Sequence, residues 1–333
     1  MSNPSFFDYA MQDQGGRRSR KFLSEMKAFI PWEALEKMLI DKGAYRPREK
    51  GRAGRPPYRS SVLLGALFLQ AWYDLSDPMT EEMIHDRLSF REFLGIQAED
   101  DIPDETTIGN FRNALMDRML FDAIFEIVFA QMQANDLVLK EGTLVDATLI
   151  HSSEPKRKKD KKGKVIRNQA NDTDATYTVK RNQRYHGYKI HIGTDPNGVI
   201  KKMTTTTAKA SDTKEFDYLT QDEEHFVTAD SAYMSKERKK DLRKKGITNG
   251  IIERRVRGQS KLRPKQTKHN KRFAPIRGLV ELSFAFIKHH MGYRRTRFKG
   301  LEKNDQYHLL LGAAYNIRRA PALVRKLHPQ REG

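Results

Sequence analysis

Three acidic residues stand in surroundings that disfavour a charge, and together they could bind metal ions. Asp146 interrupts the apolar run 144–150, and Asp230 directly follows the apolar run 226–229. Both runs have the composition of buried β-strands, where an unpaired carboxylate is strongly unfavourable. Glu281 lies at the edge of the apolar face of an amphipathic helix. Two Asp residues on strands and a Glu on a helix indicate one shared metal site.

The helix that carries Glu281 is predicted to start near Arg277. Arg277, Glu281 and Lys288 are separated by four and seven residues, so at about 100° per residue they share one face. An apolar stripe lies beside that face, formed by Val280, Phe284, Ile287 and Met291. Arg277 and Glu281 could equally form a simple ion pair one turn apart, and each acidic residue alone could be a cap or a salt-bridge partner. Only their combination favours the metal site.

Carboxylates in this combination suit phosphodiester chemistry. Two divalent ions about 3.5–4 Å apart can activate an oxygen nucleophile and stabilise the leaving oxygen. Mg²⁺ prefers carboxylates, water and phosphate oxygens as ligands. Three carboxylates repel one another until cations neutralise them, so we expect the site to be incomplete without metal and DNA. Arg277 and Lys288 would then pair with phosphates that flank the ions.

The charge of the whole chain agrees with a polyanionic partner. The 333 residues carry a net charge of +19, and the pI is about 9.8, which exceeds what solubility requires. No apolar run approaches the roughly 20 residues of a membrane-spanning helix, and the N-terminus lacks the apolar core of a signal peptide. We therefore expect a cytoplasmic, nucleoid-associated protein with no membrane partner. The absence of Cys excludes disulfides, Cys-based zinc sites and Cys nucleophiles.

Residues 1–138 predict a helical domain. Helical patterns cover residues 32–40, 62–72, 80–88, 90–94, 107–116 and 120–135. Ser60 or Ser61 is predicted to cap the second of these helices. Short helices with tight turns and exposed Arg side chains are compatible with a helix-turn-helix DNA reader, and equally with a plain helical bundle. The candidate DNA contacts are Arg52, Arg55, Arg59 and Arg112.

Residues 139–325 predict a second domain with a mixed sheet, followed by a tail over 326–333. Strand patterns cover 143–150, 185–194, 199–207, 226–229 and 247–252, with a hairpin turn at 195–198 and helices at 211–219 and 236–245. This order predicts an α+β or α/β fold, in which helices cover a mixed sheet. Residues 152–176 are predicted to form a hydrophilic loop.

A basic segment precedes the Glu281 helix. Residues 254–272 hold nine Lys or Arg residues and no acidic residue, and we interpret them as a basic insertion. Such a segment is either a solvated loop or a tract that follows phosphates, and a DNA enzyme would favour the second. The candidate DNA contacts here are Arg254, Arg255 and Arg257. His289 and His290 are neighbours on a helix, so they diverge by about 100° and cannot easily share an ion.

Several segments resemble the DDE transposases of bacterial insertion sequences, in the insertion-sequence-five group. The similar segments cover nearly the whole chain and are Ile30-Pro31-Trp32, the stretch 104–112, Leu144-Val145-Asp146-Ala147-Thr148, His186-Gly187-Tyr188-Lys189, Ala210-Ser211-Asp212, Ala229-Asp230-Ser231-Ala232-Tyr233 and Arg297-Phe298-Lys299-Gly300-Leu301. Arg277, Glu281 and Lys288 match the family's C-terminal signature. One position departs from it, because Ala274 stands where the signature has Tyr.

The resemblance implies a helical DNA-binding domain followed by an RNase H-like catalytic domain. Asp146, Asp230 and Glu281 would be the catalytic residues and the ligands of two Mg²⁺ ions, for which Mn²⁺ can substitute. The partners would be double-stranded DNA, both element ends and target, and at least a second copy of the chain. The expected DNA contacts in this domain are Arg277, Lys288, Arg297, Lys299, Arg254, Arg255 and Arg257. Two rivals stay open: a nuclease that hydrolyses without joining, and a non-catalytic DNA-binding protein derived from a transposase.

Overall fold

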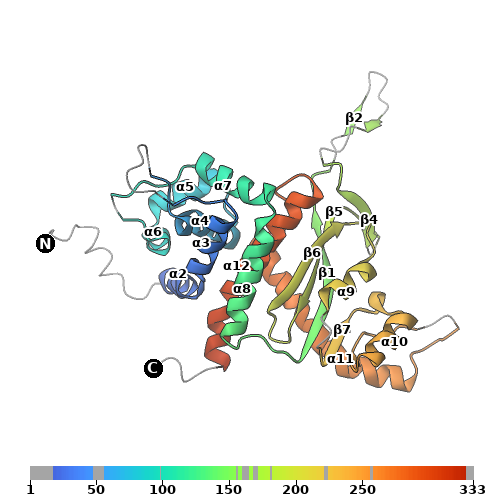
Figure 1. Cartoon of the computed structure of the whole chain (residues 1–333). Helices are drawn as coiled ribbons and strands as arrows, with labels where there is room; N and C mark the ends of the chain where they lie inside the picture. Colours follow the sequence, from blue (N-terminus) through green and yellow to red (C-terminus); the bar gives the residue numbers. More distant parts are fainter. Residues whose placement is uncertain are drawn as a thin grey trace. The chain divides into compact units, whose positions relative to one another are not determined.

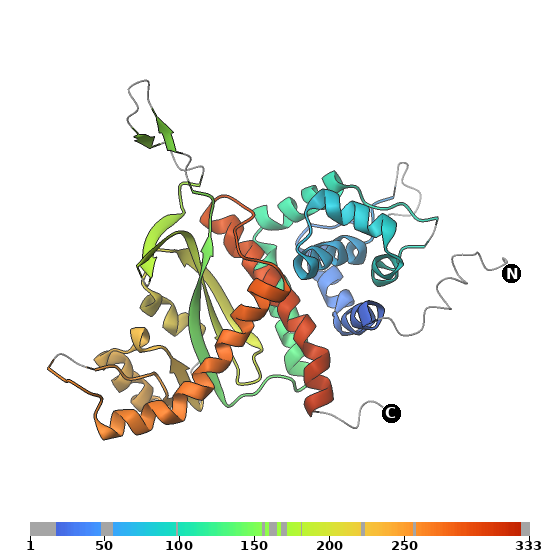
Figure 2. The ribbon, with the colours of Figure 1, turned by 180° about the vertical axis from the view of Figure 1, so that it is seen from behind.

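The chain divides into two structural units in a computed structural model (Figures 1 and 2). One unit combines residues 1–135 with 313–333, and the other comprises residues 136–312. The structure describes residues 18–47, 56–97, 99–154, 157–159, 165–167, 172–180, 182–220, 224–255 and 258–327. Among these residues, no helix combines the length and the apolar character needed to cross a bilayer.

The first unit is helical. Its helices are α2 (Arg18–Phe29), α3 (Trp32–Asp41), α4 (Ser60–Tyr73), α5 (Asp77–Asp86), α6 (Leu88–Leu94), α7 (Glu105–Asp117), α8 (Leu120–Ala134) and the last part of α12 (Leu301–Leu327). The six expected helices are present, whereas α2 and α12 were not expected. The expected Ser cap of α4 is wrong, because Arg59 occupies the N-cap position without a side-chain hydrogen bond. Ser76 and Asp104 cap α5 and α7 instead.

Helix α4 forms the centre of the first unit. Nearly all of its residues are buried, as its continuous apolar sequence predicts. The Trp72 ring stacks on Phe68 with centroids 5.7 Å apart and meets Phe93 edge-on at 5.5 Å. Its indole Nε1 donates a hydrogen bond of 2.9 Å to the carbonyl oxygen of Ala314 on α12. The last part of α12 therefore belongs to the core that Trp72 organises.

Arg112 is largely buried, whereas the sequence predicted exposed Arg side chains in this domain. Its guanidinium forms an ion pair with Asp77, and only 11% of the Arg112 side chain is exposed. Gln70 donates to the same carboxylate at 2.7 Å, so Arg112 joins α7 to α4 and α5. Arg59 donates to the carbonyl oxygen of Gly95. The other two candidates of this domain, Arg52 and Arg55, lie outside the described residues.

The second unit is built on a mixed sheet. Its strands are β1 (Gly142–His151), β4 (Thr176–Lys180), β5 (Gln183–Thr194), β6 (Ile200–Thr207), β7 (Phe226–Ala229) and β8 (Thr248–Asn249). Strand β5 pairs antiparallel with β1 on one side and with β4 and β6 on the other, while β7 and β8 run parallel to β1. The antiparallel strands β1, β5 and β6 come first in the chain, and β7 and β8 then lie on the other side of β1 and parallel to it. This is the RNase H-like topology, which confirms the expected fold class.

Gly187 allows β5 to approach the end of β1 closely. Its φ is +152°, and a Cβ atom at this position would lie 2.1 Å from the carbonyl oxygen of Ile150. No L-side chain fits there, so the pairing of His151 with Gly187 requires glycine. This close approach extends the β1 and β5 ladder beyond Asp146.

Two expectations about the edges of the sheet are wrong. The predicted loop 152–176 contains the short antiparallel pair β2 (Arg157–Lys159) and β3 (Val165–Arg167), and the chain then forms β4. The predicted strand 247–252 shortens to β8, which holds two residues. Polar and apolar side chains alternate over only the five residues of β4. The formation of this strand therefore depends more on its pairing with β5 than on its own sequence.

Helix α11 (Pro264–Ala285) begins much earlier than expected and continues into a π-helical turn over Phe286–His290. The predicted start near Arg277 is wrong, and most of the basic segment is helical. Pro275 lies inside the helix, where its exposed side tolerates the missing N–H donor. The apolar stripe is buried as predicted, at Val280, Phe284, Ile287 and Met291. This stripe fixes which face of α11 turns towards β1.

The parallel side of the sheet is covered by short helices. These are a 3-10 turn at Asp212–Glu215, α9 (Phe216–Leu219), a 3-10 turn at Ser231–Tyr233 and α10 (Lys236–Lys244). One apolar cluster joins Val145 and Val227 of the sheet to Phe216, Tyr233 and Leu242 of these helices. It anchors the first half of β1 and the carboxyl end of β7.

Candidate active site

The pairing of β1 with β7 brings two of the acidic residues together. The strands are parallel, and Val145 lies opposite Ala229. Asp146 and Asp230 follow these two residues, so they occupy neighbouring positions at the end of β7. The charge of Asp230 also acts on the carboxylate of Asp146. Two segments that are 84 residues apart in the printed sequence thus place two carboxyl groups side by side.

Asp146 has the more buried carboxylate of the two. Only 15% of its side chain is exposed. Its Oδ1 accepts a hydrogen bond of 2.8 Å from the backbone N–H of Ala147, and its Oδ2 accepts one of 2.8 Å from Arg277. Burial raises the pKa of the Asp146 carboxyl above its ordinary range, and the Arg277 guanidinium offsets this only in part. Asp146 therefore lies where additional positive charge would stabilise it.

Asp230 is exposed, and the turn that follows it is held firmly. Its Oδ1 accepts from the backbone N–H of Ser231 at 2.6 Å, which caps the 3-10 turn. Arg238 of α10 donates to the carbonyl oxygens of Tyr233 at 2.5 Å and Thr213 at 3.0 Å. The same guanidinium lies 4.1 Å from the centre of the Phe216 ring. Arg238 thereby fixes the backbone next to Asp230.

Arg277 joins Glu281 to Asp146. Its Nη1 donates to Glu281 Oε1 at 2.6 Å, and its Nη2 donates to Asp146 Oδ2 at 2.8 Å. Although burial lowers it, the pKa of the Arg277 guanidinium is raised overall by the carboxylates of Asp146, Glu281 and Asp230. The structure thus gathers the three predicted acidic residues around one arginine. The simple ion pair between Arg277 and Glu281, one of the two interpretations that the sequence left open, is present, and the shared metal site stays a prediction.

The acidic residues fit a hard cation only in part as they stand. Asp146 and Asp230 supply neighbouring carboxylate oxygens, and Asp146 lacks full charge compensation. Glu281 is turned to Arg277 and is 59% exposed. In the described part of the chain, no group of three acidic or His side chains is arranged to hold a metal ion. Release by Arg277 would free the engaged oxygen of Glu281, Oε1, for a cation.

Tyr233 is a neighbour of this site to which the sequence analysis assigned no role. Its hydroxyl is buried and has no hydrogen-bond partner among the described residues. Burial raises the pKa of the Tyr233 hydroxyl, and the charges of Asp212, Asp146 and Asp230 raise it further. Asp212 itself pairs with Lys189 at 2.7 Å, so Lys189 is engaged one layer away from the carboxylates.

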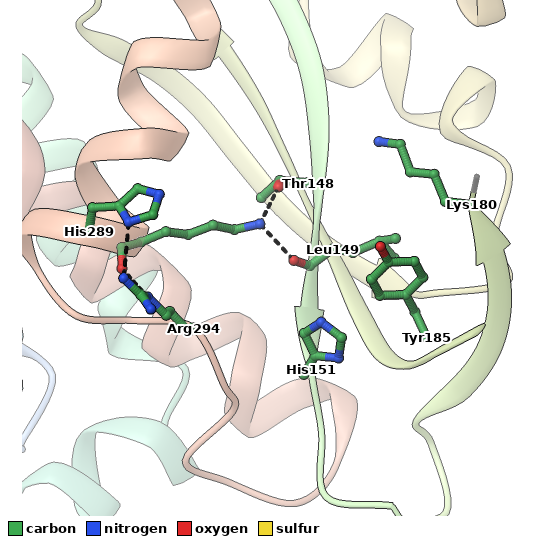
Figure 3. A pocket seen from close by; sticks show the side chains of 8 residues that line it. Thr148, Leu149, His151, Lys180, Tyr185, His289 and Arg294 are labelled. Carbon is green, nitrogen blue, oxygen red and sulfur yellow. Dashed lines mark hydrogen bonds between the residues drawn. The ribbon is translucent and has the colours of Figure 1, made fainter. Parts of the chain in front are cut away.

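Lys288 contacts β1 beyond Asp146 instead of an acidic residue. Its ammonium donates to Thr148 Oγ1 at 2.6 Å and to the carbonyl oxygen of Leu149 at 2.9 Å, as the dashed lines in Figure 3 show. Thr148 is two residues from Asp146 on the same strand, and it lines a pocket of about 450 Å³. Lys288 therefore stands next to the carboxylates along β1, on the side where this pocket opens.

The other expected DNA contacts are scattered over the second unit. Arg254 and Lys299 are exposed. Arg255 donates to the carbonyl oxygen of Ser260 at 2.9 Å. Arg297 lies 5.6 Å from the centre of the Tyr307 ring. Arg257 lies outside the described residues. Of the predicted set, the structure groups Arg277 with the acidic residues and Lys288 beside them.

Known families match both halves of the chain. A model described as "Transposase DDE domain" matches residues 139–317, and a model described as "Transposase domain (DUF772)" matches residues 12–114. One similar solved structure is described as "Cryo-EM structure of piggyBac transposase synaptic complex with hairpin DNA (SNHP)". It is 11% identical in sequence, covers 92% of this chain and 73% of its own, and has a TM-score of 0.45. Because the first model spans more than half of the chain, this protein belongs to the transposases with a DDE domain.

Proposed function

We propose that this transposase binds the ends of an insertion sequence of the insertion-sequence-five type, cuts DNA there and joins the freed strand to target DNA. The register of β1 and β7 carries this proposal. It sets Asp146 beside Asp230, with Glu281 joined to Asp146 through Arg277. Three carboxylates grouped near one arginine form a donor set suited to phosphoryl transfer. The expected place of action is the nucleoid in the cytoplasm.

Asp146, Asp230 and Glu281 would hold two Mg²⁺ ions, or Mn²⁺ in their place. When bound, such ions supply activation of the attacking oxygen and stabilisation of the leaving oxygen. The chain's own residues position the strand: Arg277 can exchange its carboxylate partners for a phosphate, because guanidinium binds both through the same pair of N–H donors. Glu281 is then released towards Asp146. Arg238 keeps the backbone beside Asp230 in place throughout.

The DNA contacts are proposed on charge and position. Arg277 and Lys288 lie at the carboxylates, whereas Arg254, Arg255, Arg257, Arg297 and Lys299 would track phosphates farther along the duplex. The helical unit would distinguish the element ends. Both ends must be held during joining, so we expect a dimer or a larger assembly on DNA.

A strand-transfer assay tests this function. Purified protein is incubated with a labelled duplex of the element end, a target plasmid and Mg²⁺. Cleavage followed by joined product is the expected result. Cleavage without joining would identify a nuclease, and end binding without Mg²⁺-dependent cleavage would identify a DNA-binding protein that has lost catalysis. Either outcome would refute the proposal.

A further inference from the structure

A cationic pocket lies beyond Asp146 along β1 (Figure 3). Its volume is about 450 Å³, and its floor is the part of β1 that carries Thr148. Figure 3 shows Lys180 and Tyr185 on one side of β1, and His289 and Arg294 on the other. None of the described residues that line this pocket is acidic. It is distinct from the cluster of carboxylates around Arg277, although both share β1.

Among the described residues, Lys180, Lys288 and Arg294 form no ion pair with an acidic side chain, and the charge of Glu154 acts only on the His151 ring of the pocket. Within the described residues, Lys288 bonds only to neutral oxygen atoms of β1. Arg294 donates to the carbonyl oxygen of Lys288 at 3.2 Å and contacts the ring of His289 at 3.0 Å. Burial lowers the pKa of the Lys288 ammonium, and repulsion by the like charge of Lys180 lowers it further. An anion from outside would relieve that repulsion.

Two aromatic rings form a wall of the same pocket. The Tyr185 and His151 rings lie 5.1 Å apart at an angle of 41°. Both line the pocket, and neither is fully buried. The Tyr185 hydroxyl is already engaged with Gln183 at 2.8 Å, so the ring faces are the part available to a ligand. Rings beside cations are the usual combination for a nucleotide, because the cations bind its phosphate and a ring stacks on its base.

We propose that this pocket binds one nucleotide of a DNA strand, with its phosphate at Lys180, Lys288 and Arg294 and its base or sugar against Tyr185 and His151. The distance fits: Thr148 lies two residues, or about 7 Å, beyond Asp146 along β1. Two nucleotides of about 3.4 Å rise each span that length. The inference rests on the proposed function, which brings a DNA strand to Asp146 and Asp230. The phosphate could belong to the backbone or to a strand end.

The test measures binding without catalysis. Fluorescence anisotropy is recorded for the full chain in EDTA, with short single-stranded DNA labelled at its 3′ end and bearing either a 5′-phosphate or a 5′-hydroxyl. Lys180→Gln should weaken binding about five- to tenfold, as expected for the loss of one charged contact. The matched control is Lys240→Gln, an exposed Lys of α10 in the same unit, which should change affinity less than about twofold.

The aromatic wall has its own pair of variants. Tyr185→Leu removes the ring and should weaken binding about fivefold or more. Tyr185→Phe keeps the ring and loses only the bond to Gln183, so it should bind like the unchanged protein. A Tyr185→Leu variant with unchanged affinity would remove the aromatic part and overturn a nucleotide as the ligand.

The two oligonucleotides separate the two sources of phosphate. A larger loss by Lys180→Gln for the 5′-phosphorylated DNA would mean that the pocket receives a strand end. Equal losses for both would mean that it receives a backbone phosphate. No binding by the unchanged protein, or equal effects of Lys180→Gln and Lys240→Gln, would overturn the proposal. Because no metal is present, these results are independent of whether the protein cuts or joins DNA.

Discussion

Arg277 is the residue on which the arrangement of the candidate site depends. It binds Asp146 and Glu281 at once, and both contacts are shorter than 3 Å. Glu281 Oε1 is bonded to Arg277, so release by this arginine would free both oxygens of Glu281 for a metal ion. A DNA phosphate is an alternative acceptor of similar geometry. Arg277 would therefore couple the arrival of DNA to the completion of the metal site.

Replacement of either Asp should abolish cleavage. Asp146→Asn or Asp230→Asn removes a charged oxygen donor while it keeps the size of the side chain, so Mg²⁺-dependent cleavage should fall below detection and duplex binding should stay within about threefold. Cleavage is measured on a labelled element-end duplex. Asp241→Asn is the control, since Asp241 is exposed and pairs only with Lys245 on its own helix. Activity of Asp230→Asn equal to that of the unchanged protein would remove Asp230 from the site.

Loss of Arg277 should make metal binding independent of DNA. Without the guanidinium, Asp146 and Glu281 lose their cation and repel each other until a metal replaces it. Mn²⁺ affinity of Arg277→Gln in the absence of DNA should therefore rise about tenfold over the unchanged protein, as judged by calorimetry. Arg277→Lys keeps the charge but loses the two parallel N–H donors of the guanidinium. Its Mn²⁺ affinity should therefore lie between those of the unchanged protein and Arg277→Gln. The same affinity in all three proteins would contradict this coupling.

Among the elements, α12 carries a buried histidine that titrates abnormally. His308 Nδ1 lies 2.7 Å from Thr205 Oγ1 of β6, and its Nε2 lies 3.0 Å from the Tyr293 hydroxyl. Both neighbours are neutral, and burial lowers the pKa of His308 from 6.5 to about 3. The neutral ring is thus part of the packing between α12 and the sheet.

Acid should weaken this packing. The folded-state pKa of His308 is below the unfolded value, so the unfolded chain binds more protons and stability falls as pH drops from about 6.5 towards 3. The loss should approach about 1.4 kcal/mol per pH unit. The unfolding free energy is measured with urea at several pH values between 7 and 5. It should fall less steeply with decreasing pH for His308→Gln than for the unchanged protein. Parallel slopes would mean that His308 does not contribute.

Helix α11 presents a row of cations before it reaches the carboxylates. Lys265, Lys268, Lys271 and Arg272 are all exposed. The logarithm of the duplex binding constant falls linearly with the logarithm of the salt concentration, with a slope of about 0.9 per phosphate contact. Neutralising these four residues should reduce that slope by up to about 3.6, with little change in sequence preference. The comparison set is Lys236, Lys240, Arg243 and Lys244 of α10. An equal effect of both sets would mean that only net charge matters.

The sequence predicted the parts of the site that have a local signal. Asp146 lies in an apolar strand, Asp230 directly follows another, and the stripe of α11 follows helical spacing, so these three elements could be predicted. The start of α11 was missed because nine cations and Pro275 resemble a solvated loop. The pocket could not be predicted, since Lys180, Tyr185 and Arg294 meet only through the pairing of β4 with β5 and the turn after α11. No local pattern encodes such contacts.

The whole molecule shows that the N-terminal unit is discontinuous. Residues 313–333 complete it through the bond from Trp72 to Ala314, through Arg318, which lies 4.7 Å from the centre of the Phe22 ring, and through the ion pair of Arg325 with Glu25 at 3.0 Å. Helix α12 begins in one unit and ends in the other. A fragment that stops at residue 138 lacks one side of its own core.

A fragment of residues 1–138 should therefore be unstable alone. Linking residues 313–327 to it should raise its melting temperature by at least about 10 °C, because each apolar side chain that is buried again contributes about 1.5–3 kcal/mol. Circular dichroism during heating measures this, with Ile317→Asp in the linked segment as the control, since Ile317 is fully buried. Equal melting of both fragments would mean that the unit is complete without α12. The stable version is the one in which to compare binding of element-end and random DNA.

The path of α12 also affects the order in which the parts of the molecule can fold during synthesis. At about 5–20 residues per second, roughly 9–36 s separate the emergence of residue 135 from that of residue 313. During that interval the RNase H-like sheet is synthesised, and the N-terminal helices lack the Ala314 carbonyl oxygen that accepts the hydrogen bond of Trp72. Ribosomes that stall or terminate early would release chains whose helical unit, for which we propose recognition of the element ends, is unfinished. On the proposed function, only a chain translated through α12 would bind the element's ends.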